Sequence, residues 1–89
     1  MIRREVTVRN RLGLHARAAA RFVHAANAFR SRVTVSRDGR TMDGKSILGI
    51  LLLAASQGTP LELGADGEDE AAAMEALATL VDSGFGEGA

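Results

Sequence analysis

The segment "RNRLGLHARAAARF", residues 9–22, places a histidine, an arginine and the expected start of a helix within a few positions of one another. His15 follows a glycine–leucine pair and precedes an alanine-rich run, so we expect it at the helix entrance. The free backbone N–H groups from Ala16 onward would form an anion site there. Arg17 adds a guanidinium that can bind phosphate oxygens through two hydrogen bonds. This combination favours reversible phosphorylation of the imidazole.

A phosphoryl group on His15 would be held by forces of moderate size. The positive end of a helix stabilises a nearby negative charge by about 0.3–2 kcal/mol, and a charge-assisted hydrogen bond from Arg17 contributes roughly 1.5–3 kcal/mol more. Moderate stabilisation suits a carrier, which must pass its phosphoryl group on. A plain helix cap or a solvent-exposed side chain is the alternative interpretation of His15.

The second histidine, His24, lies in the middle of the same expected helix. It has no free N–H groups beside it, so we expect an exposed helix residue without a role in phosphorylation. Nine residues separate His15 from His24, which is not a metal-chelating spacing on a helix, so we predict no metal site.

Two periodicities predict the elements that would position His15. Apolar residues alternate in four short segments, which indicates β-strands, and Asp38-Gly39 between two of them is a hairpin signal. The predicted strands are "EVTV" (5–8), "RVTVS" (32–36), "RTMD" (40–43) and "PLELGA" (60–65). Helical spacing predicts helices from Ala16 to about Asn27, from Ile47 to a terminator at Gly58, and within residues 66–84.

The order of these elements, βαββαβα, predicts the fold class. Alternating strands have one covered and one wet face, which favours an antiparallel sheet. Three helices on the covered face give an α+β fold, an open-faced two-layer β-sandwich with a four-stranded antiparallel sheet. No linker or repeat interrupts the sequence, so residues 1–89 are expected to form a single domain.

Composition narrows the class of protein further. The chain has no cysteine, which excludes disulfides, thiol chemistry and cysteine-based zinc sites. The N-terminal "MIRREVTV" lacks the apolar stretch of a secretory signal. The longest apolar run, "ILGILLLAA", is far shorter than the ~20 residues that span a bilayer. We therefore expect a cytoplasmic protein that uses no cofactor and does not insert into a membrane.

The net charge is zero, but the two halves of the chain carry opposite charges. Residues 1–45 hold eleven basic and three acidic side chains, a net charge of +8. Residues 46–89 hold eight acidic side chains and no basic one, a net charge of −8. Either the halves attract each other in the fold, or a basic face receives an acidic partner or a phosphate.

The segment "GRTMDGKS", residues 39–46, fits the P-loop pattern G-x-x-x-x-G-K-S letter for letter. A P-loop needs the whole segment as one loop that wraps phosphate. Here Asp38-Gly39 is better explained as a hairpin turn and residues 40–43 as the returning strand, so we expect no nucleotide hydrolysis. Ser46 is instead predicted to cap the next helix.

A small RNA-binding module of the RRM type is the alternative from another class, since it shares the order βαββαβ and a basic half. Such modules stack bases on aromatic side chains displayed by the central strands. This chain has three phenylalanines and no tyrosine or tryptophan, and none of the three lies on a predicted strand. The stacking platform is missing, so we predict no nucleic-acid partner.

The segments "GLHARAAARFV" and "GKSILGILLLAA" resemble the HPr family of histidine phosphocarriers of the bacterial phosphotransferase system, over nearly the whole chain. The closing "LVDSGFGE" and "NRLGLHAR" are also similar to NPr, the nitrogen-branch relative. The resemblance implies that His15 takes a phosphoryl group on Nδ1 from enzyme I and passes it to an enzyme IIA domain, assisted by Arg17. It implies a carrier with a phosphohistidine intermediate rather than a free-standing catalyst. Ala18 replaces the usual proline of the family motif, from which we expect a slightly looser but functional site.

The same resemblance implies regulation and docking. In many HPr proteins the serine that matches Ser46 is phosphorylated by HPr kinase/phosphorylase. An apolar docking surface with a basic rim is implied as well, formed by Ile47, Leu48 and Leu51 at its centre and by Arg17, Arg21 and Lys45 at its edge. We expect a monomer. A regulatory HPr homologue without transfer activity remains an alternative, and sugar uptake and nitrogen control remain open as pathways.

Overall fold

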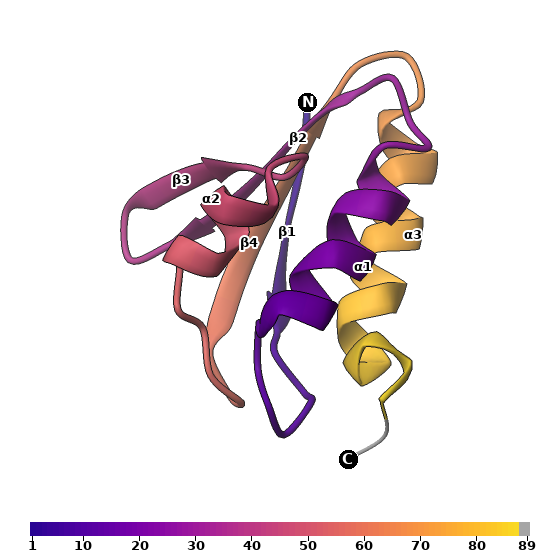
Figure 1. Cartoon of the computed structure of the whole chain (residues 1–89). Coiled ribbons are helices and arrows are strands. Elements are labelled where there is room, and N and C mark those ends of the chain that lie inside the picture. Colours follow the sequence, from indigo (N-terminus) through magenta and orange to yellow (C-terminus); the bar gives the residue numbers. More distant parts are fainter. Residues whose placement is uncertain (88–89) are drawn as a thin grey trace.

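The computed structural model describes residues 1–87 and shows the element order that the sequence predicts. Figure 1 shows the strands and helices along the chain. They are β1 (Ile2–Thr7), α1 (Ala16–Ala26), β2 (Arg32–Arg37), β3 (Arg40–Asp43), α2 (Ile47–Leu52), β4 (Pro60–Asp66) and α3 (Glu70–Asp82), followed by a single 3₁₀ turn, η1 (Gly84–Gly86). The predicted α+β fold class is confirmed.

The four strands form one antiparallel sheet in the order β1-β4-β2-β3. Helices α1 and α3 run side by side on one face of it, and α2 lies next to α1 and β3 (Figure 1). The opposite face carries polar side chains such as Arg3, Thr34 and Glu62, which line a shallow groove. The sheet therefore has one covered and one wet face, as its alternating strands predict.

The core fills the space between the sheet and the helices. The register places Val35 of β2 opposite Leu63 of β4, and Val6 of β1 opposite Leu61. All four side chains are buried and meet the apolar stripe of α1, in which Phe22 is buried. Each such side chain stabilises the fold by about 1.5–3 kcal/mol through removal from water.

The turn between β2 and β3 has the geometry that its sequence predicts. Asp38 has φ +50° and Gly39 has φ +79°, the pair of positive φ values of a type I′ hairpin turn. The following residues, Arg40–Asp43, form β3 rather than part of a phosphate-binding loop. The P-loop pattern in this segment is therefore a coincidence of sequence, as expected.

Helix α2 is shorter than predicted, and the prediction that it ends at Gly58 is wrong. It ends at Leu52, because Ala54 adopts the left-handed conformation with φ +49°. Two arginines from the hairpin bind the carbonyls at this end. Arg37 Nη1 donates to the carbonyls of Leu53 and Ala54, at 2.6 and 2.9 Å, and Arg40 Nη2 donates to the carbonyl of Leu52 at 3.2 Å. These cations satisfy carbonyls that a longer helix would have bonded internally. Gly58, with φ +87°, lies in the turn before β4 instead.

Asp69 precedes α3 but does not cap it through its side chain. Its carboxylate instead accepts hydrogen bonds from the backbone N–H groups of Arg30, at 2.8 Å, and Ser31, at 2.9 Å, and from the Ser31 hydroxyl. The Ser31 hydroxyl first, and then the Arg30 N–H, lower the pKa of Asp69 from 3.8 to about 2. An ionised carboxylate thus ties the α1–β2 loop to the start of α3.

Opposite charges of the two halves meet in the fold. Within residues 1–87, every ion pair except that of Arg37 with Asp38 joins the first half to the second, including Arg4 with Glu75 at 3.9 Å. The interpretation that the halves attract each other therefore accounts for part of the charge asymmetry. Such surface pairs contribute little each.

The fold can be compared with two other classes of function, nucleic-acid binding by aromatic stacking and insertion into a membrane. Phe22 and Phe85 are buried and Phe29 is half-buried, and none of the three belongs to a strand. The wet face of the sheet thus offers no aromatic platform for stacking bases. No helix within residues 1–87 has the length and apolar character needed to cross a bilayer.

Candidate functional site

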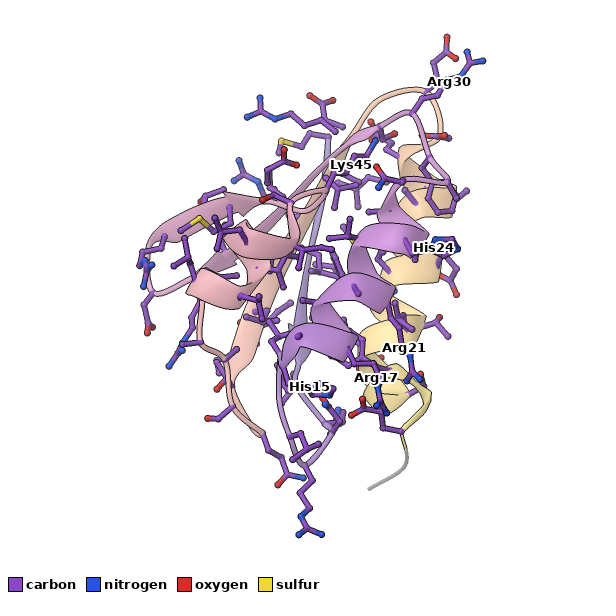
Figure 2. All side chains as sticks on the ribbon, in the orientation of Figure 1. His15, Arg17, Arg21, His24, Arg30 and Lys45 are labelled. Atoms are coloured by element: carbon purple, nitrogen blue, oxygen red, sulfur yellow. The ribbon has the colours of Figure 1, made fainter. Side chains whose placement is uncertain are left out.

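His15 lies at the mouth of α1, as predicted, and is the N-cap residue of that helix. Its backbone is extended, with φ −74° and ψ 176°, and its carbonyl accepts the first helical hydrogen bond from Ala19 N at 2.9 Å. Its Nδ1 atom accepts a hydrogen bond from the backbone N–H of Arg17 at 3.2 Å. Figure 2 shows the imidazole next to Arg17 at the start of the helix. The side chain is 26% exposed, so the ring is accessible but not free to rotate in water.

The loop before His15 is held against the segment that follows α2. Gly13 has φ +68°, and a Cβ atom at this position would lie 2.5 Å from the carbonyl oxygen of Ala55. Leu14 is buried, and its N–H donates to the same carbonyl at 2.9 Å. Glycine is required here both for its positive φ and for the close approach of two backbones. The buried side chain of Leu14 thus anchors the loop in the core.

The second ring nitrogen of His15 contacts the far end of the described chain. His15 Nε2 lies 2.7 Å from Oε2 of Glu87. A carboxylate only accepts, so a hydrogen bond of this length places the ring hydrogen on Nε2, and Nδ1, which accepts from Arg17, carries the lone pair. The hydrogen-bond partners thus assign the neutral tautomer that is nucleophilic at Nδ1.

Two further residues hold the Glu87 carboxylate. Its Oε1 accepts a hydrogen bond from Asn10 Nδ2 at 3.0 Å, and the Arg21 guanidinium lies 3.9 Å from its Oε2. Arg21 also donates to the carbonyl of the buried Phe85 at 2.6 Å. Burial raises the pKa of the Glu87 carboxyl, but the hydrogen bonds from Asn10 and His15 and the charge of Arg21 outweigh it and leave that pKa below its usual value. Glu87 is therefore ionised at neutral pH.

The groups that could receive an anion lie next to Nδ1. Arg17 is exposed, and within residues 1–87 its guanidinium makes no hydrogen bond or ion pair. The backbone N–H groups of Ala16 and Ala18 have no acceptor in this part of the chain either. The Nδ1 lone pair, the helix end and the unengaged cation thus occupy one small area, as the sequence predicts.

Ser46 caps α2 as predicted. Its hydroxyl accepts a hydrogen bond from the N–H of Gly49 at 3.0 Å, and the side chain is half-buried. A Cβ atom on Gly49 would lie 3.3 Å from the Ser46 hydroxyl and 3.5 Å from Cβ of Met42. The glycine inside α2 therefore allows close packing around Ser46. This packing explains why glycine occupies a helical position despite its low helix propensity.

Apolar side chains are exposed on α2 and in the β1–α1 loop. The exposed fraction is 44% for Ile47, 67% for Leu48 and 52% for Leu52, and Leu51 is half-buried. Leu12, in the loop before His15, is 71% exposed. The sequence predicted Ile47, Leu48 and Leu51 as docking residues, but it did not single out Leu12 or Leu52. We call these five residues the apolar docking surface.

The basic residues of the predicted rim differ in their contacts. Lys45 Nζ donates to the carbonyl of Phe29 at 2.8 Å, and Arg21 holds the η1 segment, so both are partly engaged within the fold. Arg17 is the rim residue whose cation is unengaged within residues 1–87. His24 is an exposed residue of α1, as expected (Figure 2). No cluster of three or more metal-ligating side chains occurs within these residues.

The sequence did not indicate Asn10 or Glu87 as site residues, although both belong to the site. Asn10 is fully buried, and its Nδ2 also donates to the carbonyl of Gly13 at 2.7 Å. Glu87 follows Phe85, which lies between two glycines after α3. This phenylalanine is the one feature of the sequence that indicates a folded segment at residues 84–87. No local pattern indicates that this segment returns to His15.

Comparison with known proteins decides the family. The family model described as "PTS HPr component phosphorylation site" matches residues 2–83. The chain belongs to the HPr family. The phosphocarrier protein HPr of Xylella fastidiosa is 51% identical over 87 residues, which cover 98% of each chain. The HPr-like protein Crh of Bacillus subtilis is 48% identical over 81 residues, covering 91% of this chain and 95% of Crh.

A solved structure supports the same assignment. The crystal structure of HPr-C-His from Thermoanaerobacter tengcongensis matches with a TM-score of 0.96 and 43% identity, over the whole of both chains. The resemblance to the HPr family found in the sequence is therefore confirmed.

Proposed function

We propose that Nδ1 of His15 accepts a phosphoryl group from phosphorylated enzyme I and passes it to enzyme IIA domains. The observation that carries the proposal is the contact between Nδ1 and the Arg17 N–H at the first turn of α1. It aims the lone pair of the ring at the end of a helix where anions are stabilised.

The chemistry follows from the groups around Nδ1. The lone pair of Nδ1 attacks phosphorus, and the N–H of Arg17, which now points at Nδ1, becomes a donor to a phosphoryl oxygen. The exposed guanidinium of Arg17 balances part of the dianionic charge. Because these contacts are few and solvent-exposed, the phosphoryl group stays available for transfer to the next protein.

Labelling by enzyme I tests the phosphorylated atom. Radiolabelled phosphoryl enzyme I is incubated with wild type, with His15→Ala and with His24→Ala as the matched control, since His24 is an exposed histidine on the same helix. We expect label on wild type and His24→Ala, and none on His15→Ala. Label retained by His15→Ala contradicts the proposal.

Ala18 stands where the family motif usually has proline, and α1 nevertheless begins at Ala16. Proline would preset φ in the first turn, and its absence leaves the Ala18 N–H as a further donor near the site. Our prediction of a functional but looser site is tested by Ala18→Pro, which should change the transfer rate and leave the phosphorylated residue unchanged.

The apolar docking surface is proposed to bind enzyme I and enzyme IIA in turn. Exposed leucines suit brief contacts with several partners, and Arg17, Arg21 and Lys45 would supply a basic rim. We propose that the protein works as a cytoplasmic monomer. To distinguish the two pathways, the phosphorylated protein is incubated in parallel with an enzyme IIA domain of the sugar branch and with one of the nitrogen branch. The domain that accepts the labelled phosphoryl group identifies the pathway.

Regulation at Ser46 is a second part of the proposal. A phosphate there would place negative charge beside the apolar docking surface and would repel partners that approach through acidic groups. The space over Gly49, which has no side chain, adjoins the Ser46 hydroxyl. Incubation with HPr kinase/phosphorylase should label wild type but not Ser46→Ala, and equal labelling of the two contradicts this role.

A further inference from the structure

The contact between Glu87 and His15 joins segments that are 72 residues apart in the sequence. Both side chains are largely removed from solvent, with 16% of Glu87 and 26% of His15 exposed. The proposed phosphoryl transfer takes place at Nδ1 of the ring. It therefore gives no role to the carboxylate that contacts Nε2.

Several elements together build the position of Glu87. Phe85 is buried between α3 and α1 in spite of its positive φ of +57°, and Arg21 of α1 holds its carbonyl. Asn10, in the β1–α1 loop, uses one Nδ2 hydrogen on the Gly13 carbonyl and the other on Glu87 Oε1. The same amide thus fixes both the loop that leads into His15 and the carboxylate that contacts its ring.

We propose that Glu87 is the positioning residue of phosphoryl exchange at His15, holding the hydrogen on Nε2 and balancing the positive charge that the ring gains when Nδ1 is phosphorylated. The inference rests on the proposed function, because it assigns a role in that same exchange. Asn10 supports this role indirectly, because its hydrogen bond orients the Glu87 carboxylate.

The electron balance of the step shows why a carboxylate is useful there. The lone pair of Nδ1 forms a bond to phosphorus, and the bond from phosphorus to the donor's leaving nitrogen breaks, with its electron pair going to that nitrogen. The ring then carries phosphorus on Nδ1 and hydrogen on Nε2, so it is an imidazolium cation. Glu87 Oε2, 2.7 Å from Nε2, faces this cation. On transfer, the lone pair of the acceptor attacks phosphorus and the Nδ1–P electron pair returns to the ring, which regains its starting tautomer.

The arrangement follows the logic of a carboxylate–histidine pair in which the carboxylate holds the tautomer and stabilises the imidazolium without taking its proton. Here the carboxylate contacts Nε2 and the reactive atom is Nδ1. Arg21, 3.9 Å from the same oxygen, and the two hydrogen bonds on the carboxylate keep Glu87 ionised, so that it stays an acceptor throughout.

The test uses the full-length protein and phosphoramidate, a small phosphoryl donor that needs no partner protein. Its zwitterion loses neutral ammonia when Nδ1 attacks, so the reaction reports the histidine alone. The variants are Glu87→Gln, which keeps an acceptor and removes the charge, and Glu87→Ala. The matched control is Glu68→Gln, an exposed carboxylate in the β4–α3 loop whose change alters the net charge equally.

We expect Glu87→Gln to react with phosphoramidate about five- to tenfold more slowly than wild type, because a charge-assisted bond to the developing cation is lost. Glu68→Gln should stay within about twofold of wild type. In Glu87→Ala, ¹⁵N chemical shifts of the His15 ring should move from the Nε2–H tautomer towards a mixture, a change that a purely structural role of Glu87 would not produce. Circular dichroism confirms that each variant is folded before its rate is compared.

Two results separate this inference from the proposed function. If enzyme I labels His15 but Glu87→Gln and Glu87→Ala match wild type in phosphoramidate rate and tautomer, Glu87 has no positioning role and the phosphocarrier function stands. If enzyme I does not label wild type but the Glu87 variants react slowly with phosphoramidate, the positioning role stands and the proposed function fails.

Discussion

Replacement of Gly13 by alanine tests whether the loop before His15 is as tightly placed as its geometry indicates. An alanine at φ +68° is strained by about 1–2 kcal/mol because of its conformation alone. Its Cβ atom would also lie 2.5 Å from Ala55 O, roughly 1 Å closer than ordinary contact. Because the obstacle is backbone, the loop or the Ala55 segment must move, which costs about 1–3 kcal/mol more. We therefore expect Gly13→Ala to lower the free energy of unfolding by about 2–5 kcal/mol.

Gly39 supplies the control for this prediction. It has a similar φ of +79°, but a Cβ atom there would meet nothing within 4 Å. Gly39→Ala should thus cost only the conformational part, about 1–2 kcal/mol. Urea denaturation followed by circular dichroism measures both variants. If the two differ by less than about 0.5 kcal/mol, the close approach of Gly13 to Ala55 has no energetic consequence and the reasoning fails.

The remaining predictions concern acid stability, the core and docking. The ionised Asp69 carboxylate, with its pKa lowered from 3.8 to about 2, stabilises the folded state above pH 3.8, and this contribution is lost as the pH falls towards 2. Wild type should therefore unfold at higher urea concentration than Asp69→Asn at neutral pH, and the gap should close near pH 2; a gap independent of pH contradicts the assignment. Phe85→Ala should cost about 3–5 kcal/mol in urea denaturation and slow the phosphoramidate reaction as Glu87→Gln does, since the η1 segment loses its anchor. A normal rate in the folded variant would show that Glu87 needs no such support. Leu48→Asp, at a residue 67% exposed, should change the free energy of unfolding by less than about 0.5 kcal/mol and slow labelling by enzyme I; unchanged labelling excludes this leucine from the apolar docking surface.

Local patterns in the sequence predict most of the fold. The alternation of Val33 and Val35 and of Leu61 and Leu63 identifies strands with one buried face, and each of these side chains is buried. The Asp38-Gly39 turn forms because its φ values are accessible to those residue types. In each case the residues that decide the structure are neighbours in the chain, so the sequence alone is sufficient.

The parts that could not be predicted depend on contacts between distant residues. Helix α2 ends at Leu52, where Ala54 turns left-handed and where Arg37 and Arg40, from a separate hairpin, bind the carbonyls of residues 52–54. His15 and Arg17 are recognisable because helix start, histidine and arginine are adjacent, whereas Glu87 reaches His15 only after the whole domain is assembled. No periodicity or motif encodes such a contact, and only coordinates reveal it.

The place of β4 in the sheet has a consequence for folding. This strand pairs with both β1 and β2, yet it is the last of the four to be synthesised. Until residues 60–66 leave the ribosome, β1 has no partner on either side, and the sheet cannot close. Pairings of this long range make folding slower than that of a helical bundle of equal size. The exposed charged side chains of Arg3, Arg4 and Glu5 disfavour edge-to-edge pairing of this strand with another chain.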